Sequence, residues 1–248
     1  MRQQRLFWLS NDDRLHFPPV EAALTQPNGL VAVGGDLSPE RLVSAYRQGI
    51  FPWFEEDQPI LWWSPDPRAV LYPARLRVRR SLAKRIRNAG FEVTVDRAFR
   101  PVMEACAAPR RDSAGTWITT GMLDAYTRLH QEGLAHSVEV WEGDELVGGL
   151  YGVGLGAVFF GESMFSHRAD ASKVALVWLV RHLQAEGVHF IDCQVSSSHL
   201  ATLGAVDIPR TRFIRELDDA LWQRPYGMGW TFKPGFHPLR TEEQEPRA

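Results

Sequence analysis

Four polar side chains stand inside two apolar stretches of the sequence, and they are the first candidates for chemistry. Glu162 and Ser163 follow the apolar residues 157–160, while Asp192 and Gln194 alternate with apolar residues in the stretch "IDCQV". A carboxylate or carboxamide in an apolar strand is costly unless it is hydrogen-bonded or faces a cavity. These side chains therefore predict either a satisfied structural network or the wall of a pocket.

The alternation of a strand suggests how these groups meet. Successive side chains point to opposite faces, so Asp192 and Gln194 are expected on one face and Cys193 on the other. Asp192 would then orient the Gln194 amide so that its oxygen points at an incoming donor. If the strand bearing Glu162 is a neighbour, two carboxylates share a pocket, which favours a raised pKa or a cationic ligand. The aromatic surroundings favour the cation, Arg or Lys.

Two further motifs are weaker candidates for a site. The string "GVGLGA" at residues 152–157 satisfies G-x-G-x-x-A, but it continues as a strand, whereas a phosphate-binding loop must open a helix. The string "GES" at residues 161–163 would need Gly at position 165 to form a nucleophile elbow, and that residue is Phe165. A glycine-rich hairpin is favoured over a nucleotide site, and Ser163 is expected to form hydrogen bonds rather than to act as a nucleophile.

A basic run and several tryptophans suggest a nucleic-acid partner. In a chain of formal net charge −2, seven cations without an acid occur at Arg75, Arg77, Arg79, Arg80, Lys84, Arg85 and Arg87. Either a solvated basic face or a surface for a phosphate backbone explains such a run. Loop-like contexts beside Pro or Gly hold Trp53, Trp62, Trp63 and Trp117. Loop aromatics together with a basic run are used to stack unpaired bases.

The composition is that of a globular protein without cofactors. Of the 248 residues 44% are hydrophobic and 11% aromatic, which is enough for a core. No apolar stretch is long enough to span a bilayer and no signal peptide is evident, so a cytoplasmic protein without membrane contact is expected. The two cysteines lack a C-x-x-C motif and the eight histidines are scattered, so neither a disulfide framework nor a bound metal is expected.

The chain divides into two regions of different pattern. Residues 1–73 are rich in Pro and Gly, which predicts a small N-terminal domain with one helix that Ser38 caps and Gly49 ends. Residues 74–248 are more regular, and Asp96 is expected to cap a helix there. Further helices are predicted at residues 122–131 and 171–186, and strands at residues 135–141, 145–153, 157–165 and 188–195. This order predicts a mixed sheet in an α/β or α+β fold.

The stretches "PNGLVAVGGDLSPERLVSAYRQGIFPWF", "LWWSPDPRAVL", "GTWIT", "GESMFS" and "IDCQV" carry a close resemblance to the leucyl/phenylalanyl-tRNA-protein transferase family, between about Phe17 and Phe213. The resemblance implies an α+β fold, with a small N-terminal domain and a larger domain similar to the GNAT (Gcn5-related N-acetyltransferase) fold, whose sheet is mixed and mainly antiparallel. It also implies a monomer that transfers Leu or Phe, and weakly Met, from aminoacyl-tRNA to the N-terminal Arg or Lys of proteins, marking them for degradation. No cofactor is implied, because the aminoacyl ester is already activated.

The resemblance also implies roles for individual residues. Glu162 would pair with the acceptor's Arg or Lys side chain, and Asp192 would polarise Gln194, which accepts or steers a proton from the attacking amine. The basic run would hold the acceptor stem. The 3′-terminal adenosine and the aminoacyl side chain would contact Trp53, Trp117, Leu150, Phe159, Ser163 and Ile191.

Two rival functions share some of these features. An acyl-CoA-dependent N-acetyltransferase would share the fold class, but no loop-to-helix signature for the CoA pyrophosphate is present. A non-catalytic tRNA-binding module would explain the basic run and the tryptophans, but it leaves Glu162, Asp192 and Gln194 without a purpose.

Overall fold

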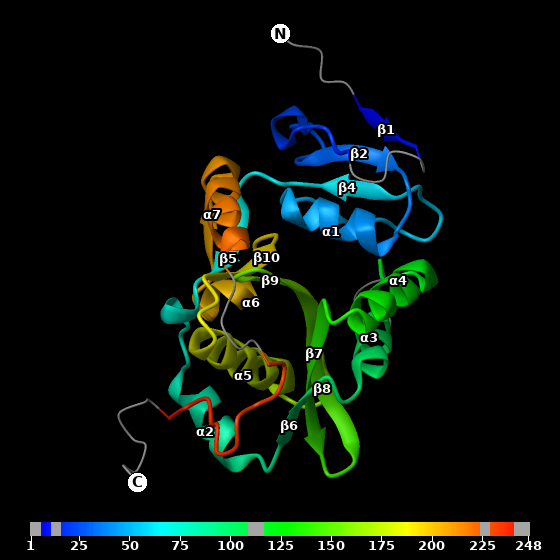
Figure 1. Ribbon diagram of the computed structural model, residues 1–248. Helices are drawn as coiled ribbons and strands as arrows, with labels where there is room; N and C mark the ends of the chain where they lie inside the picture. The colour runs from blue at the N-terminus through cyan, green and yellow to red at the C-terminus, as the bar shows by residue number, and fades with distance from the viewer. Residues whose placement is uncertain (1–5, 11–15, 109–116, 224–228, 241–248) are drawn as a thin grey trace.

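Two β-sheets pack against a shared hydrophobic core in this protein (Figure 1). The structure, a computed structural model, describes residues 6–10, 16–108, 117–223 and 229–240. A four-stranded sheet comes from the N-terminal part of the chain and a seven-stranded sheet from the remainder. Among the described helices, none has the length and hydrophobicity needed to cross a bilayer.

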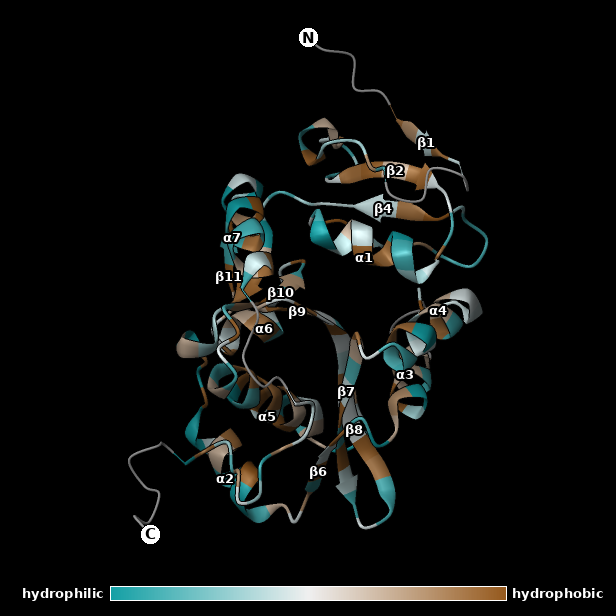
Figure 2. Ribbon diagram, in the orientation of Figure 1, coloured by the Kyte–Doolittle hydropathy of each residue, from teal (hydrophilic) through white to brown (hydrophobic). Residues whose placement is uncertain are grey.

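The small sheet has the strand order β1-β2-β4-β3, with β1 parallel to β2 and the other pairs antiparallel. Its strands are β1 (Phe7–Leu9), β2 (Leu30–Gly34), β3 (Phe51–Pro52) and β4 (Leu61–Trp63). The apolar run "LVAVG" forms β2, which is brown along most of its length in Figure 2 because its residues are hydrophobic, and its first four residues are buried. Trp62 of β4 is fully buried, and its indole N–H donates to the Gly34 carbonyl at 2.8 Å.

Helix α1 (Pro39–Arg47) connects the small sheet to the rest of the protein. Ser38 is the N-cap residue as predicted, although its hydroxyl donates to Asp36 at 2.6 Å instead of capping the helix backbone. Gly49 follows the helix with a φ of 71°, a conformation that glycine adopts without strain. The buried face of α1 carries Tyr46, whose hydroxyl reaches across to the larger sheet.

The larger sheet has the order β11-β5-β10-β9-β8-β7-β6, and all of its pairs are antiparallel except β9 with β10. Its strands are β5 (Arg68–Leu71), β6 (Glu92–Val95), β7 (Ala135–Glu142), β8 (Glu145–Leu155), β9 (Val158–Ser166), β10 (Phe190–Gln194) and β11 (Val206–Ile208). The expected α+β class with a mixed, mainly antiparallel sheet is confirmed. Strands β8 and β9, helix α5 and strand β10 follow in the predicted order.

Helices cover both faces of this sheet. A side chain added at Gly148 would point toward Ala171 of α5 (Ala171–Ala185). One added at the neighbouring Gly149 would point toward Val102 of α3 (Phe99–Ala107). In Figure 1, α3 and α4 lie on the opposite side of β7 and β8 from α5. The remaining helices are α2 (Arg80–Asn88), α4 (Thr120–Gln131), α6 (Ser198–Thr202) and α7 (Arg210–Trp222), with 3-10 turns at Val20–Ala22 and Pro73–Arg75.

Asp96 does not cap helix α3, so the sequence expectation for this residue is wrong. The N-cap position is Ala98, and Asp96 has a φ of 56°. Its carboxylate instead accepts the backbone N–H of Ser137 at 2.8 Å and lies 2.7 Å from Nδ1 of His136. Asp96, two positions before the N-cap, thus forms its hydrogen bonds with strand β7 and not with the helix.

The division of the chain into two domains at residue 73 stays a prediction, but the strand pairing indicates where the chain passes from one sheet to the other. Strand β5 (Arg68–Leu71), which that division puts in the N-terminal part, pairs with β10 and β11 in the larger sheet. The last strand of the small sheet ends at Trp63. Residues 64–67 therefore connect the two sheets.

Candidate active site

The candidate site is a cavity of about 1070 Å³ that lies where strands β9 and β10 part. The two strands pair from Phe190–Val158 to Asp192–Phe160; β10 then ends at Gln194 while β9 continues to Ser166. Helices from both faces of the sheet and the β3–β4 hairpin contribute to its walls. The predicted residues that line it are Trp53, Trp117, Leu150, Phe159, Glu162, Ser163, Ile191 and Gln194.

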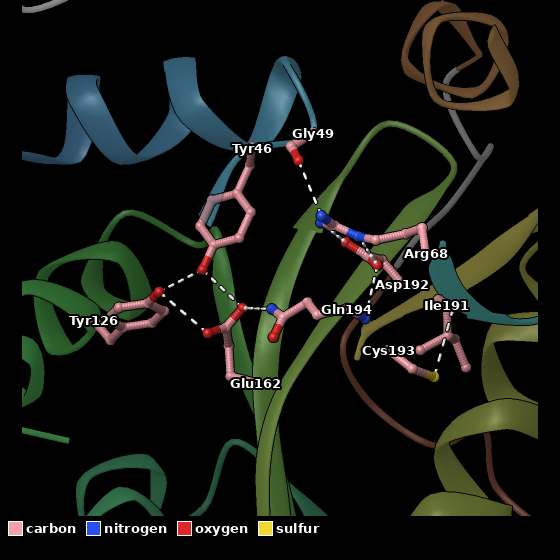
Figure 3. A network of polar contacts seen from close by, with 9 residues as sticks. All are labelled: Tyr46, Gly49, Arg68, Tyr126, Glu162, Ile191, Asp192, Cys193 and Gln194. Carbon is pink, nitrogen blue, oxygen red and sulfur yellow. Dashed lines mark hydrogen bonds and ion pairs between the residues drawn. The ribbon is translucent and has the colours of Figure 1, made fainter. Parts of the chain in front are cut away.

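Glu162 is held by side chains from three other elements (Figure 3). The Tyr46 hydroxyl of α1 lies 2.7 Å from Oε1, and the Tyr126 hydroxyl of α4 lies 3.2 Å from Oε2. The Gln194 amide donates from Nε2 to Oε1 at 2.8 Å. The hydroxyls of Tyr46 and Tyr126 also contact each other. Residues far apart in sequence therefore converge on one carboxyl group.

Burial raises the pKa of the Glu162 carboxyl to about 7, and the hydrogen bonds from Tyr46 and Gln194 oppose this shift. The proton count of the network agrees with that direction. The three contacts among Tyr46, Tyr126 and Glu162 need three protons, and the two hydroxyls supply two. A protonated Glu162 supplies the third, whereas an ionised Glu162 places a negative charge at the cavity wall.

Gln194 faces the cavity because the end of β10 departs from strand geometry. Its φ is 63°, and the pairing of β10 with β5 shifts register between Asp192 and Gln194. Cys193 and Gln194 both line the cavity and Asp192 does not, so the predicted alternation of faces is wrong at this point. Since Nε2 of Gln194 donates to Glu162, its Oε1 is left as a hydrogen-bond acceptor.

Asp192 forms a buried ion pair with Arg68, whose side chain is also fully buried. Arg68 donates from Nε at 2.8 Å and from Nη2 at 2.6 Å to the two carboxylate oxygens. Oδ1 also accepts the backbone N–H of Gln194 at 2.9 Å. The expectation that Asp192 holds the Gln194 side chain directly is therefore corrected: Asp192 holds its backbone, and Glu162 holds its amide.

The two predicted stacking residues face the same cavity. Trp53 is 47% exposed, which leaves its ring accessible, and its backbone is fixed by hydrogen bonds to Leu61 at 2.9 Å and from Trp63 at 2.7 Å. Trp117 precedes α4 and is partly buried. Two aromatic residues from separate parts of the chain, one after β3 and one before α4, thus line the cavity.

The predicted apolar residues form a buried wall of the same cavity. Leu150, Phe159 and Ile191 are buried members of the core around α5, and Ser163 on β9 is partly exposed beside them. Further apolar lining comes from Met164, Leu176, Leu179 and Leu200. This wall suits an aliphatic or aromatic side chain.

The predicted basic run lies outside the cavity, on the 3-10 turn before α2, the following loop and α2 itself. Leu82 is the buried residue of α2, and its partly buried neighbour Ile86 also packs in the core around α5. Arg85 is partly buried, with its guanidinium 5.8 Å from the Phe91 ring. The exposed cations are Arg75, Arg77, Arg79, Arg80, Lys84 and Arg87.

Sequence reasoning missed four residues of the site. Tyr46 and Tyr126 lie at buried positions of helices, where sequence spacing does not distinguish a tyrosine from an ordinary core residue. Arg68 had a usable signal, since it is a charge in the apolar strand "RAVL". Tyr151 is fully buried, lines the cavity, and has a hydroxyl without a hydrogen-bond partner among the described residues.

One group among the described residues has metal-ligand chemistry, namely Asp96, His130 and His136, whose ligand atoms lie within 4.8 Å of one another. The protein already uses these atoms. Nδ1 of His130 lies 2.8 Å from the Ala135 carbonyl, and the nitrogens of His136 lie 2.7 Å from Asp96 and 3.1 Å from the Gly133 carbonyl. This group therefore fits a structural hydrogen-bond network.

Both cysteines are thiols outside any disulfide, and they differ in their exposure. Cys106 is buried, whereas Cys193 is partly exposed and both line the cavity. Burial by protein atoms raises the pKa of the Cys193 thiol, so it stays protonated at neutral pH.

Sequence profiles match most of this chain. The profile described as leucyl/phenylalanyl-tRNA protein transferase matches residues 70–218, and the profile described as its N-terminal domain matches residues 35–66.

Curated relatives agree over nearly the whole length, and each is a leucyl/phenylalanyl-tRNA–protein transferase. The protein of Nitrosospira multiformis is 59% identical over 225 residues, which cover 91% of this chain and 96% of that protein. The protein of Alkalilimnicola ehrlichii is 54% identical over 243 residues, or 97% and 94% of the two chains. The protein of Pseudomonas aeruginosa is 58% identical over 222 residues, or 90% and 98%.

Among solved structures, L-PGS from Bacillus licheniformis is similar over 67% of this chain and 53% of that chain, with a TM-score of 0.38 and 11% identity. This distant likeness carries no argument about function.

Proposed function

This chain belongs to the leucyl/phenylalanyl-tRNA–protein transferase family, and we propose from that premise that it transfers Leu or Phe, and weakly Met, from aminoacyl-tRNA to the N-terminal Arg or Lys of acceptor proteins. Transfer of an aminoacyl group from tRNA to protein is the activity of the family. Marking of the acceptor for degradation, action in the cytoplasm and a monomeric state belong to the same proposal.

The observation that supports this proposal best is the single cavity that joins an apolar wall, two tryptophans and a polar network. Trp53 and Trp117 suit stacking on the terminal adenine, since every base offers a π-face. The wall of Leu150, Phe159 and Ile191 suits a Leu or Phe side chain, which is selected by shape and burial.

The acceptor would enter on the side of Glu162. An ionised Glu162 is a partner for the cationic side chain of an N-terminal Arg or Lys, and a partly desolvated charge pair is worth more than a pair in water. An N-terminal Asp would instead meet like charge. This difference gives the expected selectivity for basic N-termini.

Gln194 would guide the attacking amine. Its Oε1 accepts an N–H of the neutral α-amine, and Glu162 holds the amide in the orientation that this requires. Asp192 would contribute by fixing the backbone of Gln194. A carboxamide is a poor base, so its contribution is mainly one of position.

All bonds and protons of the transfer reaction are accounted for without a cofactor. The amine nitrogen attacks the ester carbonyl carbon, a C–N bond forms, and the C–O bond to the tRNA ribose breaks. The departing ribose oxygen takes up the proton that the amine loses. The products are a protein longer by one residue and a tRNA with a free 3′-terminal ribose.

The exposed cations of the basic run would contact the acceptor stem of the tRNA. Phosphate contacts position a nucleic acid without reading its sequence, which fits an enzyme that uses more than one tRNA.

The test is transfer of labelled Leu from Leu-tRNA to two peptides that differ only in N-terminal Arg or Asp, without ATP or CoA. Label on the Arg peptide alone is expected. Label on neither peptide, with tRNA still bound, would favour a tRNA-binding module. Labelling of a peptide by acetyl-CoA in a parallel reaction would favour an N-acetyltransferase.

A further inference from the structure

The glycine-rich string at residues 152–157, which lies in strand β8 and the turn after it, has a packing role beside the cavity. A side chain at Gly152 would come within 2.6 Å of ring carbons of Phe159 and would also collide with the Phe160 carbonyl. A side chain at Gly154 would come within 2.9 Å of Cζ2 of Trp230. These two glycines of β8 therefore leave room for two aromatic rings.

The two rings belong to one aromatic cluster with His136. The Trp230 indole lies 5.6 Å from the Phe159 ring, centroid to centroid, and 3.7 Å from the His136 imidazole, to which it is nearly parallel at 10°. The His136 ring is held in place by the contacts of its two nitrogens with Asp96 and with the Gly133 carbonyl. Trp230 is thus held between a fixed imidazole and the ring of Phe159.

Phe159 lines the cavity, whereas Trp230 is not among the described residues that do. Phe159 is only 1% exposed, so its position depends on the side chains packed around it. Trp230 comes from the C-terminal segment, more than 70 residues further along the chain, and packs against this cavity-lining residue.

We propose that Trp230 is a positioning residue that sets the aminoacyl specificity of the cavity by fixing the ring of Phe159. This inference rests on the proposed function, because it assumes that the Leu or Phe side chain packs against Phe159. With the indole removed, the Phe159 ring has space to retreat toward His136. The cavity becomes deeper and accepts the larger Phe side chain more readily than before.

The experiment compares kcat/KM for Phe-tRNA with kcat/KM for Leu-tRNA, both with the same N-terminal Arg peptide. In Trp230→Ala the ratio of Phe to Leu is expected to rise about 3- to 10-fold, which is less than the roughly 10- to 200-fold effect of a whole methylene in an apolar pocket because the Phe159 ring retreats only part of the way. A merely structural role would lower both values together and leave the ratio unchanged. Trp230→Phe, which keeps an aromatic ring, is expected to shift the ratio in the same direction by less.

Trp222→Ala is the matched control, since Trp222 is 90% exposed at the end of α7. Its ratio is expected to equal that of the unchanged protein. If Trp230→Ala does not fold, Trp230→Phe decides, and an unchanged ratio in the variant that folds overturns the inference. Absence of transfer from both tRNAs by the unchanged protein would instead overturn the proposed function.

Discussion

In the proposed function, acceptor choice depends on Glu162, whose carboxyl group changes charge near neutral pH. Its carboxyl group is surrounded by two tyrosine hydroxyls and an amide, and burial raises its pKa to about 7. A group of this kind is protonated or ionised according to small changes in its surroundings. The proposed pairing with an N-terminal Arg or Lys needs the ionised form.

Transfer to an N-terminal Arg peptide is therefore expected to rise with pH through about 7. Glu162→Gln is expected to lower kcat/KM about 10- to 100-fold at pH 8, the value of one charged hydrogen bond. The α-amine of the peptide also titrates, so the measurement is the ratio of the unchanged protein to Glu162→Gln at each pH. A ratio that is constant from pH 5.5 to 8.5 would remove Glu162 from acceptor binding.

The sign for folding stability is opposite to that for activity. Because the folded pKa of Glu162 lies above its ordinary value of 4.5, the folded protein binds the proton more tightly than the unfolded chain does. The resulting stabilisation is complete below pH 4.5 and is lost as the pH rises through about 7.

The ion pair of Arg68 and Asp192 is fully buried, so both of its charges have lost their contact with water. Both side chains are fully buried, and Arg68 also donates to the Gly49 carbonyl at 3.1 Å while lying over the rings of Phe51 and Phe213. Removal of one partner leaves a buried charge unpaired, which strongly lowers the free energy of unfolding. Removal of both partners lowers it less, because no unpaired charge remains.

Arg68→Met and Asp192→Leu are each expected to lower the free energy of unfolding by about 3 to 5 kcal/mol. The double variant should lose clearly less than the sum of the two, as measured by urea unfolding. Arg168 and Glu142 form the matched exposed pair, for which the same cycle should give a much smaller coupling because solvent screens the two charges. Additive losses at Arg68 and Asp192 would contradict the pairing.

At the scale of elements, helix α2 presents cations to solvent while Leu82 anchors it to the core. Such a helix is suited to a polyanion, because each phosphate contact releases counterions.

Replacement of Arg79, Arg80 and Lys84 by Ala is expected to weaken tRNA binding and to reduce the slope of log K against log salt by about 1 to 3. Replacement of Arg100 and Arg168 by Ala, which also removes exposed cations, is expected to leave the slope unchanged. An unchanged slope in the first variant would show that α2 does not contact the tRNA.

At the scale of the whole molecule, the two sheets share one core. Residues of the small sheet and α1, such as Trp62 and Tyr46, belong to the same cluster of buried residues as Tyr126 and Phe160 of the larger part. The Tyr46 and Phe160 rings lie 4.9 Å apart. Neither sheet can lose its packing without exposing part of the other.

Urea unfolding is therefore expected to be one cooperative transition, with the same midpoint by tryptophan fluorescence and by far-ultraviolet circular dichroism. Two separated transitions would mean that the N-terminal part unfolds independently. Tyr46→Ala, which removes a ring from the shared core, should lower the single midpoint without splitting the transition.

Helices α1, α3, α4 and α5 and strands β7 to β10 could be predicted from the sequence to within a few residues, whereas α2, α6, α7 and the other described strands were not predicted. Apolar spacing reveals the strands around Glu162 and Asp192, and it depends on neighbours in sequence, so a single chain is enough to read it. The resemblance to a known family pointed to Trp53 and Trp117 at the cavity.

The contacts among these groups could not be predicted from the sequence, because they depend on how the elements pack. Asp192 accepts hydrogen bonds from Arg68, which is 124 residues away in sequence. Glu162 contacts the hydroxyl of Tyr46, which is 116 residues away. The φ of 63° at Gln194 turns that side chain into the cavity against the alternation of the strand. Periodicity assigns a residue to a face but not to a partner, because partners are chosen by the packing of elements that the sequence places far apart.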